Sequence, residues 1–259
     1  MPVTQSMPDA SPVPEIGRVT PAELRAALRA GIADFRRAPV YGLIFSAVYV
    51  VAGIALLLIG AGTLTWTLTL SLGFPLVAPF AAVGFYEISR RLEAGEPLVA
   101  SEIFGVVAAE RRRQVPWLGA MLVMIFLFWS FFAHMLFAAF VGPSSMFEPV
   151  SLAWLLTPEG ALHSAIQMIV GGAVAFFTFS VTVVSLPLLL EREIDFVSAM
   201  LLSLRTVARN LPVMLIWALI IAVVLVAAML PLFLGLFIAL PVLGHATWHL
   251  YRRALYDPV

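Results

Sequence analysis

Two histidines close to the C-terminus have a spacing that could support metal or haem chemistry. His245 and His249 are four residues apart, so on a helix both imidazoles point to the same side and could share one metal ion. No carboxylate neighbours them in the sequence, so the pair supplies only half of a ligand set. We therefore name His245 and His249 as candidate cofactor ligands, but we expect hydrogen-bonded histidines there and predict no cofactor and no metal site.

Other chemical signatures are missing from the sequence. The chain contains no cysteine, which excludes disulfides, thiolate metal sites and thiol catalysis. It also lacks the G-x-S-x-G, H-E-x-x-H and glycine-rich phosphate-loop patterns. His134 lies in an apolar segment, where we expect it to hydrogen-bond to a neighbouring helix. We predict no catalytic residue and no enzymatic activity, and a net charge of +0 does not suggest nucleic-acid binding.

The elements that would position these residues are long apolar segments. The composition is 62% hydrophobic and 12% charged, which is far more apolar than a water-soluble domain. Six runs each approach the ~20 residues that a helix needs to cross hydrocarbon. They are 40–59, 64–86, 116–140, 164–190, 211–230 and 233–250. The runs are continuous rather than alternating, so we predict an all-α polytopic membrane bundle of six transmembrane helices and not a β-barrel.

The arginines predict how this bundle is oriented. All fifteen basic residues are arginines, and each falls in a segment that alternate crossings place on one side of the membrane. They are Arg18, Arg25, Arg29, Arg36, Arg37, Arg90, Arg91, Arg111, Arg112, Arg113, Arg192, Arg205, Arg209, Arg252 and Arg253. Because arginine-rich segments stay in the cytoplasm during insertion, we predict that both termini are cytoplasmic, in the bacterial inner membrane.

The chain before the first apolar run divides into a tail and a helix. Residues 1–19 are polar and rich in proline, and we predict a disordered cytoplasmic tail, followed by one six-helix domain over residues 20–259. Thr20, Pro21 and Glu23 form the pattern of a capping box with proline at the first helical position. The helix that begins there is amphipathic, and it could lie in the membrane interface or pack on the bundle itself.

Three segments have this organisation. Amphipathic helices are predicted over 20–37, 97–113 and 195–209, and each is followed by Arg-x-x-Pro at the start of an outward-going span. This suggests three helical-hairpin repeats, although proline is common at helix starts in general. The inward-going spans contain Pro75, Pro79, Pro187 and Pro241, which predict kinks or breaks. A short interfacial helix is expected near Trp154 in the outer link.

Three stretches of the sequence are distinctive: GFYEISRRLEAGEP (84–97), VSLPLL (184–189) with the residues that follow it, and PVLGHATWHLYR (241–252). They resemble a bacterial family of predicted integral membrane proteins called domain of unknown function 2189. The resemblance extends over nearly the whole chain after the tail and implies a polytopic membrane protein. Some relatives carry a cytochrome oxidase label, but an oxidase subunit with two haems and a copper needs more histidines than the four found here.

These observations favour a structural, scaffolding or assembly role in the membrane. The partners expected are the lipid bilayer and, on the cytoplasmic side, other membrane proteins or anionic lipids. Arg111, Arg112 and Arg113 are the candidate contact residues. Two alternatives stay open: a transporter or channel for a weakly polar solute, with kinked spans lining its path, and a haem-binding redox subunit that uses His245 or His249.

Overall fold

The computed structural model describes residues 14–58, 64–142 and 152–256, and the chain is helical almost throughout. The helices are α1 (Pro21–Arg37), α2 (Pro39–Leu58), α3 (Leu64–Ala94), α4 (Ala100–Ala109), the 3₁₀ helix η1 (Glu110–Arg112), α5 (Val115–Val141), α6 (Leu152–Leu155), α7 (Pro158–Thr182), α8 (Ser185–Glu191), α9 (Phe196–Arg209), α10 (Leu211–Met229) and α11 (Leu236–Ala254). Two short strands, β1 (Glu15–Ile16) and β2 (Leu255–Tyr256), complete the described chain. The predicted all-α class is confirmed.

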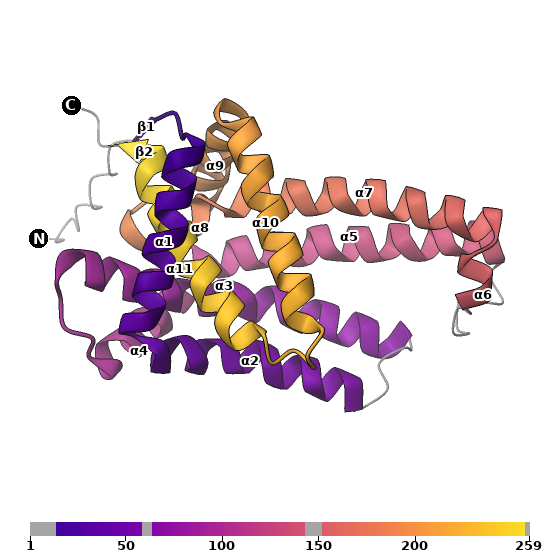
Figure 1. Ribbon diagram of the computed structural model, residues 1–259, viewed down its shortest axis with the longest axis horizontal. Coiled ribbons are helices and arrows are strands. Elements are labelled where there is room, and N and C mark those ends of the chain that lie inside the picture. The colour runs from indigo at the N-terminus through magenta and orange to yellow at the C-terminus, as the bar shows by residue number, and fades with distance from the viewer. Residues whose placement is uncertain (1–13, 59–63, 143–151, 257–259) are drawn as a thin grey trace, which may run out of the picture.

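The α5–α7 hairpin extends away from the rest of the molecule, with α6 at its far end (Figure 1). The short strands and α4, α8 and α9 lie at the opposite end. The buried residues of α5 are Val115, Leu118, Gly119 and Ser130, whereas Phe128 and Phe131 are 69% and 67% exposed. An apolar hairpin with so little protein around it is suited to lipid, which covers apolar side chains as well as a protein core does.

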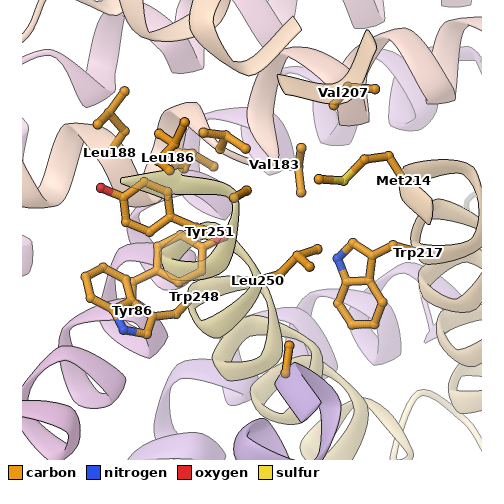
Figure 2. Close-up of a cluster of buried hydrophobic side chains, with 14 of the residues drawn as sticks. Tyr86, Val183, Leu186, Leu188, Val207, Met214, Trp217, Trp248, Leu250 and Tyr251 are labelled. Atoms are coloured by element: carbon orange, nitrogen blue, oxygen red, sulfur yellow. The ribbon is translucent and has the colours of Figure 1, made fainter. Parts of the chain in front are cut away.

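Helix α11 is the centre of the main core. Trp248 of α11 stacks beside Tyr86 of α3, with 6.5 Å between the ring centroids. In Figure 2, Leu250 of the same helix faces Trp217 of α10, and Met214 extends toward Val183. Trp217, Met214 and Trp248 are fully buried. This core therefore joins the last hairpin to α3 and to the break between α7 and α8.

Helix α1 packs directly on α11. Its amphipathic face therefore packs on the bundle, which is one of the two positions that the sequence left open. The capping box at Thr20 and Glu23 is present, as predicted. Leu24, Ala27 and Gly31 are buried along one side of the helix. A Cβ atom on Gly31 would lie 2.6 Å from the backbone nitrogen of Ala246, so only glycine allows this close approach of the two helices.

The predicted tail needs a correction at its C-terminal end. Glu15 and Ile16 pair antiparallel with Tyr256 and Leu255, so residues 14–19 are ordered rather than part of a disordered segment. Asn210 holds this segment in place, because its side chain accepts a hydrogen bond from the Val19 amide at 2.7 Å and donates one to the Gly17 carbonyl at 3.0 Å. Residues 1–13 lie outside the described part of the chain.

Within the described residues, three helical segments are long and apolar enough to cross a membrane: Val115–Val141, Pro158–Glu191 and Leu211–Met229. The count rises to four if α1 and the first part of α2, which meet at a bend of 100°, form one broken span. The chain is thus a membrane protein with multiple candidate spans. This result does not show the six spans or the helical-hairpin repeats that the sequence predicts.

The prolines have different effects in different helices. The span around Pro187 is broken, since α7 ends at Thr182 and α8 begins at Ser185. The Ser203 hydroxyl accepts a hydrogen bond from the Val184 amide at this break, and so satisfies a donor that the helix leaves free. By contrast, α3 continues through Pro79 and α11 through Pro241. The predicted break is therefore confirmed at Pro187. The short helix predicted at Trp154 is also present, as α6.

Candidate binding pocket at the helix ends

A charged pocket of about 630 Å³ lies at the end of the molecule that carries α4 and α8. The carboxyl ends of α3, α4 and α8 meet there with η1 and the last turns of α11. The pocket is lined by Glu87, Arg90, Glu93, Ala94, Val106, Ala109, Glu110, Arg113, Leu190, Glu191, Trp248 and Arg252. Its volume falls in the range of small-molecule sites, and it combines one apolar wall with seven charged side chains.

Glu87 is the buried centre of the first ion-pair group. It is 1% exposed, and it accepts hydrogen bonds from Arg90 Nε at 2.8 Å and from Arg91 Nε at 2.6 Å. Arg91 reaches on to Glu102 with its Nη1 at 2.6 Å. Two neighbouring arginines thus stabilise the buried Glu87 carboxylate.

Glu191 and Glu93 form the opposite side of the pocket. Arg252 donates from Nη1 to Glu191 at 2.7 Å and lies 3.5 Å from Glu93. Tyr251 also hydrogen-bonds to Glu191, and the indole of Trp248 donates to Glu93 Oε2 at 2.9 Å. Glu93 of α3 and Glu191 of α8 therefore both bind side chains at the end of α11.

Glu110 is the least satisfied carboxylate of the pocket. Its Oε1 accepts from Arg113 Nη1 at 2.5 Å, and the same guanidinium donates from Nη2 to Glu193 at 2.6 Å. Oε2 is buried and has no hydrogen-bond partner among the described residues. Burial raises the pKa of the Glu110 carboxyl above its usual range, although Arg113 acts in the opposite direction. A buried acceptor without a donor is a site that a ligand could complete.

The candidate contact residues Arg111, Arg112 and Arg113 do not act as one patch. Arg111 and Arg112 are exposed, and Arg111 donates to the Ala108 carbonyl at the end of α4, at 3.3 Å. Arg113 instead turns inward to Glu110 and Glu193. The 3₁₀ turn of η1 separates the three side chains in this way. Of these three arginines, Arg111 and Arg112 are therefore the ones with exposed side chains.

The candidate ligands His245 and His249 are joined through Asp34 of α1 rather than through a shared open centre. His249 Nε2 lies 2.7 Å from Asp34 Oδ2, and Ser89 Oγ donates to the same oxygen at 2.9 Å. His245 Nδ1 lies 2.8 Å from Ser89 Oγ. Among the residues that the structure describes, no group of three or more His, Asp or Glu side chains is arranged to hold a metal ion.

Sequence reasoning missed Asp34 and Ser89. One signal was available for Asp34: it lies three residues after Gly31, on the side of α1 that also carries Leu24 and Ala27, so it interrupts an otherwise apolar face. The partners of such a carboxylate come from α3 and α11, and the sequence does not indicate which residues they are. His134, for which a bond to a neighbouring helix was predicted, instead lies 2.6 Å from the Ser130 carbonyl of its own helix.

Comparison with known proteins identifies one family. Residues 67–191 match the family described as predicted integral membrane protein (DUF2189). The match includes two of the three stretches on which the resemblance was based, 84–97 and 184–189, and it ends before the third. It also covers most of the pocket-forming helices, from α3 to α8. No curated protein and no solved structure matches the chain.

Proposed function

We propose that this chain, whose residues 67–191 match the family of predicted integral membrane proteins, is a six-span protein of the bacterial inner membrane with a non-enzymatic, scaffolding or assembly role. Both termini lie in the cytoplasm in this proposal. The charged pocket and the exposed Arg111 and Arg112 form a cytoplasmic docking surface for a membrane partner or anionic lipid.

The observation that carries this proposal is the separation of charge from apolar surface. The pocket gathers seven charged side chains at one end of the molecule, whereas α5 contains no charged residue over its 27 residues. Helix α2, with 20 residues, and helices α3 and α11, with 31 and 19, are each close to the length needed for a further span. Together with the three candidate spans, they support six crossings.

Reporter fusions test the proposed topology. Alkaline phosphatase fused after Gly142 should be active, because the link between the third and fourth spans would then be periplasmic. Fusions after Arg113 or Val259 should be inactive, because both positions would be cytoplasmic. Activity measured in whole cells, normalised to fusion abundance, gives the result. An active fusion at Val259 would contradict six crossings with both termini inside.

A second experiment tests the proposed docking surface. Changing Arg111 and Arg112 to Gln should leave insertion intact, because thirteen arginines remain to orient the chain. It should weaken binding of anionic lipid, or of a co-purifying membrane partner, by about thirtyfold, since two arginines near an anionic surface together contribute about 2 kcal/mol. Mass spectrometry of the detergent-extracted protein measures both.

The matched control removes the same charge elsewhere. Arg205 and Arg209 are also exposed, one turn apart on α9, and changing both to Gln should retain lipid and partner as in the wild type. If both double variants retain lipid and partner, the arginines serve only to orient the protein; if both lose them equally, binding depends on total charge. Either result contradicts a docking surface at Arg111 and Arg112.

A further inference from the structure

The pocket contains a carboxylate that its own structure leaves incomplete. Glu110 is 1% exposed, yet the only donor to its carboxylate among the described hydrogen bonds is Arg113, and Oε2 has none. Arg113 is in addition shared with Glu193. An unpaired, buried carboxylate oxygen is costly in any protein, so its presence at the wall of a pocket points to a donor that arrives with a ligand.

The charge of the pocket favours a cation over an anion. Four of its lining residues are glutamates and three are arginines. Each of these arginines is already bound by at least one carboxylate: Arg90 by Glu87, Arg113 by Glu110 and Arg252 by Glu191. An incoming anion would have to displace these carboxylates, whereas a cation meets a lining in which carboxylates outnumber guanidinium groups. Glu110 Oε2 is buried beside the pocket and must turn toward the cation to accept its hydrogen bond.

The apolar and aromatic lining residues indicate the chemistry of the uncharged part of the ligand. Val106, Ala109 and Leu190 form an apolar wall beside the carboxylates, and Trp248 also lines the pocket. An alkyl stem fits against such a wall while its charged head reaches the carboxylate. An aromatic ring adds a favourable face for a cation. The lining therefore matches a cation on a short apolar chain better than a hydrated metal ion.

We infer that this pocket binds an organic cation, a primary ammonium or guanidinium group on an apolar stem, with Glu110 as the acceptor. The inference rests on the proposed function in one respect: if the pocket docks a partner protein, the cation is a lysine or arginine side chain of that partner. The same chemistry could come from a free amine, and the experiments below separate the two sources.

Calorimetric titration of the full-length protein in detergent tests the inference directly. Saturable binding is expected for n-butylammonium and n-butylguanidinium, and none for n-butanol or butyrate, which have the stem without the positive charge. Folded wild-type protein that binds neither cation, or that binds n-butanol equally well, would overturn the inference.

Two variants and one control link binding to Glu110. Glu110→Gln should weaken binding of both cations by about tenfold or more, because a charge-assisted hydrogen bond is lost. Ala109→Phe should also abolish binding, because it fills the pocket and leaves every carboxylate in place. Glu193→Gln is the matched control: Glu193 shares Arg113 but does not line the pocket, so binding should change by less than about threefold.

Circular dichroism establishes whether each variant is folded. If Glu110→Gln does not fold, the affinity of Ala109→Phe tests whether the cations bind in the pocket. Unchanged affinity in both folded variants would show that the cations bind elsewhere and would refute the assignment.

Native mass spectrometry of protein released from membranes then assigns the source. A small amine adduct, displaced by n-butylammonium, identifies a free ligand. A bound protein that is released by n-butylguanidinium, but not by the same concentration of NaCl, identifies a partner side chain. The titrations of the wild type and of the pocket variants decide whether the pocket binds cations. The Arg111 and Arg112 variant independently decides whether the surface docks a partner or lipid, so failure of one leaves the other standing.

Discussion

Replacing Gly31 by alanine is expected to separate α1 from α11. The new Cβ would lie 2.6 Å from the Ala246 nitrogen and 2.7 Å from the Val242 carbonyl oxygen. Both are backbone atoms, which cannot move aside as the end of a side chain can, so the helices must part. We expect a loss of about 3 kcal/mol in the free energy of unfolding, measured by denaturant titration in mixed micelles.

Gly105 provides the control, because it is also helical but a Cβ there meets nothing within 4 Å. Gly105→Ala should leave the free energy of unfolding unchanged or raise it by up to about 1 kcal/mol, since alanine favours helix. Equal effects at the two glycines would show that α1 does not pack on α11 at this distance.

The second large effect is expected from Asp34→Ala. Asp34 is 4% exposed, and it accepts from Ser89 and His249 on two other helices. Removing it takes away the acceptor that Ser89 and His249 share, and among the described hydrogen bonds only Ser89 then keeps a side-chain partner, His245 Nδ1 at 2.8 Å. We expect a loss of about 3 kcal/mol in the free energy of unfolding, measured in the same micelles.

A double-mutant cycle that combines Asp34→Ala with His249→Ala measures the interaction energy between these two side chains, apart from their other contacts. Because the two side chains are in contact, a coupling energy of about 1 kcal/mol or more is expected. Glu96→Ala is the control: Glu96 pairs with Arg90 at 3.4 Å with its side chain 42% exposed, and its removal should cost less than about 1 kcal/mol. Additive effects of Asp34→Ala and His249→Ala would mean that the contact contributes nothing to stability.

The spacing of the two candidate histidines predicted their common side of the helix but not their partners. The four-residue separation of His245 and His249 placed both on one side of a helix, and both do reach the same group of residues around Asp34 and Ser89. It did not show that the group is anchored by a carboxylate 215 residues away in the chain. In the same way, Arg111, Arg112 and Arg113 were named together as candidate contact residues, and the sequence did not show that Arg113 turns inward to Glu110 and Glu193.

By itself, the sequence determined the features that depend on neighbouring residues. The helical class, the apolar runs of α5, α7 and α10, the capping box at Thr20 and the break at Pro187 all follow from composition, periodicity and local hydrogen bonding, which act over a few residues. Only the tertiary structure decided which charges are paired, which glycine permits close packing, and that Glu110 keeps an unpaired oxygen beside a pocket. These depend on contacts between helices far apart in the chain. Many arginine–glutamate pairings satisfy the same local pattern, and only the packing of α3, α4, α8 and α11 selects among them.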